Sequence, residues 1–178
     1  MLSDWDYFDR ARNGDEIAWK ILYNKYYKLL LKITLLITGS IDTAKDLVQE
    51  TFIRMINIRL KHRDGSFKSY IATTAYRLAL KAKEYSKRNN GLDNVEIPDE
   101  TSSPLETIIK TESDKIIVGL INSLPDNQRD ILILRLYGEQ SYEEIARLLK
   151  LPLGTVKSRI FYAVKLCRKK LTEKGIME

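Results

Sequence analysis

The chain has 178 residues, 44% hydrophobic and 30% charged, which is the composition of a globular protein with enough apolar side chains for a core. With one cysteine, Cys167, and one histidine, His62, it cannot form an internal disulfide or a cysteine-rich zinc site, and we expect no metal, no cofactor and no catalytic site. The net charge of +6 favours anionic partners.

Four helices are predicted in the first 88 residues, because Val, Ile and Leu recur at intervals of three and four. Glycine-containing turns separate them, and their ranges are 4–13, 16–38, 42–60 and 66–87. The most apolar run, 29–39, is too short to cross a bilayer of about 30 Å, so we interpret it as a core helix without membrane insertion. The mixed, acidic N-terminus shows no secretory signal, and the expected location is the cytoplasm.

Residues 89–104 are predicted to be a linker, since they contain Asn-Asn-Gly, two prolines and no helical period. Helices are then expected at 105–124, 126–137, 142–149 and 153–174. The charges are also unevenly distributed. Residues 1–88 contain 17 basic and 10 acidic side chains, residues 89–114 contain 1 basic and 7 acidic, and residues 115–178 contain 12 basic and 7 acidic. The fold class is therefore all-α, with two compact lobes whose basic surfaces favour a polyanion.

The second lobe has the layout of a helix-turn-helix. Ser141 and Glu144 have the spacing of a capping box at the start of the first helix, whose inner face is Ile145, Ala146 and Leu149. Leu151 fills the turn, and Pro152 suits the start of the second helix.

The second helix separates into two faces. Its inner stripe is predicted to be Val156, Ile160, Ala163, Val164, Cys167 and Leu171, which makes Cys167 a core residue and not a redox sensor. Its outer positions suit the DNA major groove, where Lys and Ser reach base edges and a ring contacts a thymine methyl. These positions are Thr155, Lys157, Ser158, Arg159, Phe161, Tyr162 and Lys165. An amphipathic helix with a solvated basic face remains the alternative.

Residues 124–171 resemble the C-terminal domain of extracytoplasmic-function (ECF) sigma factors, of the sigma-70 type. They contain the Leu-Pro-x-x-x-Arg opening, the Tyr-x-Glu-Ile-Ala helix and the run Gly-Thr-Val-Lys-Ser-Arg. The resemblance implies that the outer face of the second helix reads the −35 promoter element. Related helix-turn-helix regulators share the second half of this motif.

Residues 42–56 resemble the family's Ala-x-Asp-Leu-Val-Gln-Glu-x-Phe helix. At 100° per residue, Ala44, Leu47, Val48, Thr51, Phe52 and Met55 share the inner side. The opposite side is polar and acidic, with one isoleucine in its middle, and favours docking to a protein. In the family this helix binds the clamp helices of the RNA polymerase β′ subunit, which carries over to Asp46, Gln49, Glu50, Ile53 and Asn57.

The helix 66–87 interleaves basic and aromatic side chains, which suits melted DNA because cations track the backbone while rings accept unstacked bases. Its inward stripe is predicted to be Phe67, Ile71, Thr74, Ala75, Leu78 and Ala82, whereas Tyr76 lies outside it; Tyr70 and Tyr76 as ordinary core or rim aromatics remain the alternative. By resemblance, this helix and the preceding loop open the −10 element and flip a base into a pocket. The implied contacts are His62, Arg63, Ser66, Phe67, Lys68, Tyr70, Thr73, Arg77 and Lys81.

The chain is thus identified as a member of the ECF sigma factors, with domain two at 1–88, a linker at 89–104 and domain four at 105–178. The resemblance implies binding to core RNA polymerase, through the β′ clamp helices and the β flap, binding to promoter DNA, and an anti-sigma factor as partner. Two alternatives remain: a stand-alone helix-turn-helix regulator and a protein-interaction module without DNA binding. Only the sigma factor interpretation requires the face formed by Asp46, Gln49, Glu50 and Ile53.

Overall fold

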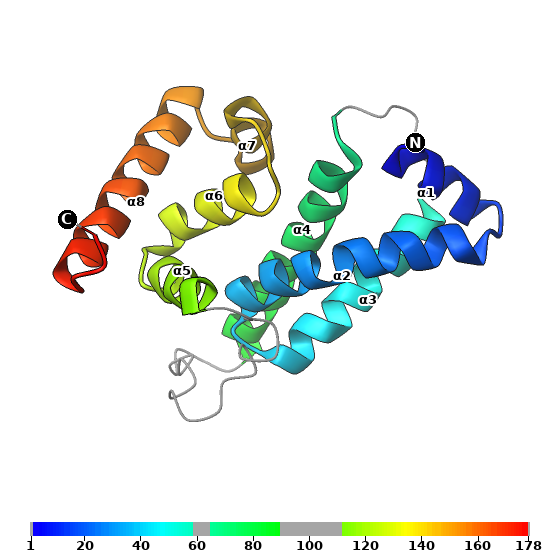
Figure 1. Ribbon diagram of the computed structural model, residues 1–178, viewed down its shortest axis with the longest axis horizontal. Coiled ribbons are helices and arrows are strands. Elements are labelled where there is room, and N and C mark those ends of the chain that lie inside the picture. The colour runs from blue at the N-terminus through cyan, green and yellow to red at the C-terminus, as the bar shows by residue number, and fades with distance from the viewer. Residues whose placement is uncertain (1, 59–64, 90–111, 178) are drawn as a thin grey trace. The chain divides into compact units, whose positions relative to one another are not determined.

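The computed structural model of the protein describes residues 2–58, 65–89 and 112–177. Within these ranges the chain forms eight α-helices and no β-strand, which confirms the all-α prediction (Figure 1). The chain divides into two compact units, Met1–Pro98 and Asp99–Glu178. The expectations for His62 and Arg63 lie outside the described residues, and so does the start of the helix predicted at 105–124. Of the linker predicted at 89–104, only Asn89 is described, and it is helical.

The first unit contains α1 (Asp4–Arg12), α2 (Glu16–Thr38), α3 (Ile41–Asn57) and α4 (Phe67–Asn89). Helix α2 is the centre of this unit and packs against each of the other three. Its buried side, which includes Leu22, Leu30 and Ile33, forms the core. The 29–39 run is therefore a core segment, and no described helix has the length and apolar character needed to span a membrane.

Local signals in the sequence set the helix ends of the first unit. Ser3 and Asp6 form a capping box before α1, and the side chain of Asp15 accepts from Ala18 N–H at the start of α2. Gly39 ends α2 with φ of 72°, a conformation that favours glycine. Helix α3 was expected to reach residue 60, but it ends at Asn57 because Ile58 is extended.

The second unit contains α5 (Glu112–Asn122), α6 (Asp126–Leu136), α7 (Tyr142–Leu149) and α8 (Leu153–Glu173). The predicted capping box is present, since Ser141 Oγ accepts from Glu144 N–H and the Glu144 carboxylate accepts from Ser141 N–H. Lys150 closes α7 in the left-handed conformation, with φ of 54°, and Pro152 directly precedes α8. This tight turn lets α7 and α8 pack together around Ile145 and Val156, both fully buried.

Candidate nucleic-acid and protein interfaces

One side of α3 is a solvent-exposed surface with an apolar centre. Phe52 and Met55 are buried on the inner side, at 4% and 1% exposure, whereas Ile53 is 52% exposed. Around Ile53 lie Asp46, Gln49 and Asn57, all exposed, and Glu50, which is partly exposed. The structure therefore brings together the five residues that the sequence placed on this side.

A sixth residue of this surface, Ile56, was missed by the sequence analysis. It is 45% exposed and follows Ile53 by three positions, so the two isoleucines lie next to each other on the helix. That spacing was readable in the sequence, but Ile56 falls at the edge between the two sides. We define the α3 face as these six residues: Asp46, Gln49, Glu50, Ile53, Ile56 and Asn57.

Hydrogen bonds order part of the α3 face. Arg54 Nε donates to Glu50 Oε1 at 2.6 Å, one helical turn apart. Asn57 Nδ2 donates to the carbonyl of Ile53 at 3.1 Å. Leu47 was predicted to point inward but is partly exposed. The buried side of α3 is therefore narrower than expected.

Two aromatic residues of α4 require corrections. Phe67 was expected to contact DNA, but its ring is 2% exposed and packs against Phe8 and Tyr26, with centroid distances of 5.4 Å in both cases. Tyr76 was expected outside the inward stripe, but it is also 2% exposed. Phe67 is a core residue because rings of α1 and α2 enclose it, and Tyr76 is one because this side of α4 packs against α2 and α3.

The remaining candidates on α4 are accessible. Ser66, Arg77 and Lys81 are exposed, and Lys68, Tyr70 and Thr73 are partly exposed. Ser66 Oγ accepts from Ser69 N–H at 3.0 Å, which caps the helix. Partial burial raises the pKa of Tyr70, and the nearby Arg77 opposes this shift, so the phenol stays protonated at neutral pH beside a cation.

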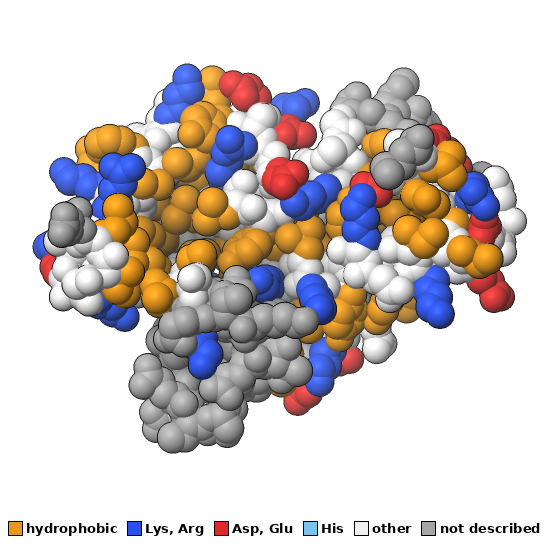
Figure 2. Space-filling view, viewed as in Figure 1, with side chains coloured by type: hydrophobic (Ala, Val, Ile, Leu, Met, Phe, Trp, Pro, Cys, Tyr) orange, Lys and Arg blue, Asp and Glu red, His pale blue; other side chains and the backbone are white. Residues whose placement is uncertain are grey.

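Helix α8 presents rings and cations together. Phe161 and Tyr162 are 63% and 58% exposed and contact each other edge to face, with centroids 5.5 Å apart. Lys157, Ser158 and Lys165 are exposed, while Thr155 and Arg159 are partly exposed. Figure 2 shows Lys and Arg side chains interspersed with hydrophobic ones over this helix. Such a surface suits a major groove, where rings and cations are both used.

Ser158 has an alternative partner in the free protein. Its Oγ donates to the carbonyl of Thr155 at 3.0 Å, within the first turn of α8. A base acceptor would have to replace the Thr155 carbonyl as the partner of this O–H, which reduces the net free energy gained from that contact.

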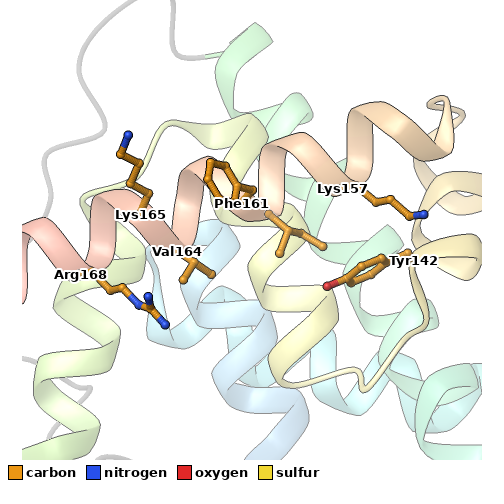
Figure 3. Close-up of a pocket in the computed structure, with 7 residues that line it drawn as sticks. Tyr142, Lys157, Phe161, Val164, Lys165 and Arg168 are labelled. Atoms are coloured by element: carbon orange, nitrogen blue, oxygen red, sulfur yellow. The ribbon is translucent and has the colours of Figure 1, made fainter.

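An open hollow of about 460 Å³ lies along α8, lined by Tyr142, Lys157, Ile160, Phe161, Val164, Lys165 and Arg168. Figure 3 shows Tyr142, Val164 and Arg168 on one side of the helix. Val164 was predicted to belong to the inner stripe, but it is 39% exposed. The inner side of α8 instead contains Ala163, which is buried, with Leu166 and Cys167 packed against the same hydrophobic cluster. This side is buried because α5 and α6 cover it.

Cys167 packs against the cluster of Leu124, Leu132 and Ala163. Burial raises the pKa of its thiol, and Lys170 opposes the shift. A thiol with a raised pKa is a poor nucleophile, so this cysteine fits a structural position. No group of three or more potential metal ligands occurs among the residues that the structure describes.

Two family models match the chain: Sigma-70 region 2 over residues 22–89 and Sigma-70, region 4 over residues 114–167. The ECF RNA polymerase sigma-E factors of Escherichia coli (strain K12) and Salmonella typhimurium are each 31% identical to it over 179 residues. These alignments span 92% of this chain and 91% of each relative. The RNA polymerase sigma-H factor of Pseudomonas aeruginosa is 26% identical, over 90% of this chain and 89% of that protein.

Two solved structures share the fold. CnrH in complex with the cytosolic domain of CnrY has a TM-score of 0.64 and 15% identity, covering 96% of this chain and 97% of that one. The sigma factor RpoE from Bartonella quintana, in complex with the anti-sigma factor NepR, has a TM-score of 0.53 and 21% identity, covering 86% and 98%.

Proposed function

The chain belongs to the ECF group of sigma-70-type sigma factors, which associate with RNA polymerase and direct promoter-specific initiation, and from this premise we propose which of its surfaces makes each contact. The proposed domains are domain two at 1–88, a linker at 89–104 and domain four at 105–178. The proposal assigns no catalytic step to this chain, since the polymerase performs the chemistry of RNA synthesis.

Helix α8 is proposed to read the −35 element in the major groove. The exposed rings of Phe161 and Tyr162 would contact base edges and thymine methyls, and Lys157 and Ser158 would donate to base acceptors. Thr155, Arg159 and Lys165 would support these contacts at the flanks, with phosphates as partners for the cations.

Helix α4 is proposed to open and hold the −10 element. Its accessible candidates are Lys68, Tyr70, Thr73, Arg77 and Lys81, and Ser66 precedes it. Tyr70, Thr73, Arg77 and Lys81 share one side of the helix at 100° per residue, and Lys68 lies on its other flank. Cations beside a partly exposed ring suit a single strand whose bases are unstacked. His62 and Arg63, outside the described residues, remain predicted contacts for a flipped base. Phe67 is excluded from this set because it is buried.

The α3 face is proposed to dock on the β′ clamp helices of core polymerase, and domain four on the β flap. Support comes from the exposed pair Ile53 and Ile56 within a polar surround, an arrangement typical of the centre of a protein interface. The single observation that carries the whole proposal is that this face and the base-reading side of α8 occur in one chain. A stand-alone helix-turn-helix regulator needs only the second.

An anti-sigma factor is proposed as a further partner. The support is that RpoE of Bartonella quintana, which shares this fold, was solved with one. We also propose that the acidic linker mimics nucleic acid inside the polymerase. Neutralising Asp93, Glu96, Asp99 and Glu100 should then change the yield of abortive transcripts, and an unchanged yield would contradict this role.

Footprinting on a promoter that the holoenzyme transcribes tests the proposal. We expect protection of two elements, near −35 and −10, only when the chain and core polymerase are both present. Tight promoter binding by the chain alone, with no transcript when core is added, would favour the stand-alone regulator instead.

A further inference from the structure

An aromatic cluster joins α1 and α2 to the beginning of α4. Trp5 lies edge to face against Phe67, with centroids 5.1 Å apart, and its ring is 5.9 Å from that of Tyr70 and 5.8 Å from that of Phe8. The Phe67 ring also contacts Tyr26 of α2. Within this cluster Phe8 is fully buried, whereas Trp5 and Tyr70 are partly exposed at its rim.

Trp5 also bonds the backbone just before α4. Its Nε1 donates to the carbonyl oxygen of Gly65 at 3.2 Å, across 60 positions of sequence. Gly65 has φ of 82°, a conformation that favours glycine, so this carbonyl is aimed by a specific backbone turn. The contact fixes the point at which the chain enters α4.

Helix α1 is bonded to α2 at the residue before Trp5. Asp4 accepts from Lys25 Nζ and from the Tyr26 hydroxyl, both at 2.6 Å. The capping box of Ser3 and Asp6 fixes the start of the helix. Asp4 bonds α1 to α2, and Trp5 beside it contacts Gly65 and the first turn of α4, so the start of α4 is positioned relative to α2.

We propose that Trp5 is a positioning residue for promoter opening. It contacts Gly65, Phe67 and Tyr70, which lie next to the proposed −10 contacts Ser66 and Lys68 in sequence or, for Tyr70, belong to them. Trp5 lies before residue 22, where the match to Sigma-70 region 2 begins, so that match gives it no role. A start of α4 that is fixed before DNA arrives spares the complex the entropic cost of ordering it during melting. The inference rests on the proposed role of α4.

The test compares Trp5→Phe with Trp19→Phe. Trp5→Phe keeps an aromatic ring and removes the N–H that donates to the Gly65 carbonyl. Trp19→Phe makes the same substitution in a ring whose centroid is 5.5 Å from that of Phe52 in α3. Each holoenzyme is given a duplex promoter and the same promoter with its −10 region already unpaired by mismatches. Permanganate reactivity of unpaired thymines measures the rate of opening, and the transcript measures initiation.

Trp5→Phe should open the duplex roughly two- to fivefold more slowly, the scale expected for one solvent-accessible hydrogen bond, and should initiate normally on the unpaired template. Trp19→Phe should behave as the parent protein on both. In Trp5→Phe the remaining tryptophan, Trp19, reports by its fluorescence that the first unit is folded.

Equal slowing on both templates would place the defect in polymerase binding or stability and overturn the inference, as would unchanged opening of the duplex. If the parent holoenzyme opens no promoter, that result contradicts the proposed role of α4 itself, whatever the Trp5 variant does. The two failures are therefore distinguishable.

Discussion

Phe52 and Ile53 are adjacent in sequence and lie on opposite sides of α3, the first 4% exposed and the second 52%. Phe52 packs against Trp19 and Tyr23 of α2, with centroid distances of 5.5 and 4.9 Å. Because neighbouring side chains on a helix are about 100° apart, burial of Phe52 leaves Ile53 on the exposed side. A helix with this division is anchored on one side and free to bind a partner on the other.

The double substitution Gln49→Ala with Ile53→Ala should weaken binding to core polymerase by about 1–2 kcal/mol, roughly five- to thirtyfold in Kd, because it removes an apolar anchor from the interface centre. Fluorescence anisotropy of a labelled chain titrated with core measures this change. The helical content should stay that of the parent protein.

The matched control for the α3 face is Ile17→Ala on α2, at an isoleucine that is 73% exposed. Its binding to core should equal that of the parent. If Ile17→Ala weakens binding as much as the α3 variant, or the α3 variant binds normally, docking does not occur through the α3 face.

Two lysines of α8 should respond differently. Lys157→Ala should cost about 1–3 kcal/mol on the preferred promoter and relax the preference at one −35 position, since it removes a contact to a base edge. Lys169, which is exposed and 3.7 Å from Glu173, is expected to meet only phosphate. Lys169→Ala should weaken all promoters alike and reduce the salt dependence by about one phosphate contact.

Holoenzyme binding to a set of −35 variants, at several salt concentrations, measures both effects. The assignment of Lys157 fails if its substitution lowers affinity by the same factor for every variant.

Phe67→Ala should destabilise the first unit by about 3–5 kcal/mol, because the ring is enclosed by Trp5, Phe8 and Tyr26. Urea unfolding followed by tryptophan fluorescence reports this unit specifically, since Trp5 and Trp19 both lie in it. Ser66→Ala, at the exposed cap of the same helix, should cost only about 1 kcal/mol. A normal unfolding curve for Phe67→Ala would return this residue to the DNA-contacting set.

Cys167 should react slowly with iodoacetamide in the folded protein, because burial raises the pKa of its thiol above the ordinary value of 9.0 and less thiolate is present at a given pH. The rate should keep increasing as the pH passes 9.0. By the same shift, the folded chain keeps a proton that the unfolded chain loses, so stability declines as the pH rises through this range. Alkylation as fast as in urea would contradict the structural position.

Much of the fold could be predicted because local signals agreed with the periodic pattern. The ranges expected for α2 and for the first helix of the helix-turn-helix match at both ends, since Asp15, Gly39 and Ser141 cap these helices by short-range hydrogen bonds. The two sides of α3 followed from 100° per residue because neighbouring helices cover only one of them.

The predictions that were wrong concern the burial of residues whose neighbours come from distant parts of the chain. Phe67 was predicted both in the inward stripe and among the DNA contacts, and its burial confirms only the first; the burial of Tyr76 depends on the packing of α4 against α2 and α3. Val164 sits at the edge of its stripe, where the position of α5 and α6 determines exposure. The bond from Trp5 to Gly65 spans 60 positions and has no local signal.

As a sigma factor, this chain should give core polymerase a promoter preference. The most direct measurement maps the 5′ ends of transcripts made from genomic DNA by purified core polymerase, with and without the chain. We expect new, discrete start sites that appear only with the chain and that share two upstream elements at a fixed spacing. Identical transcripts in both reactions, or new ones without shared elements, would contradict the claim.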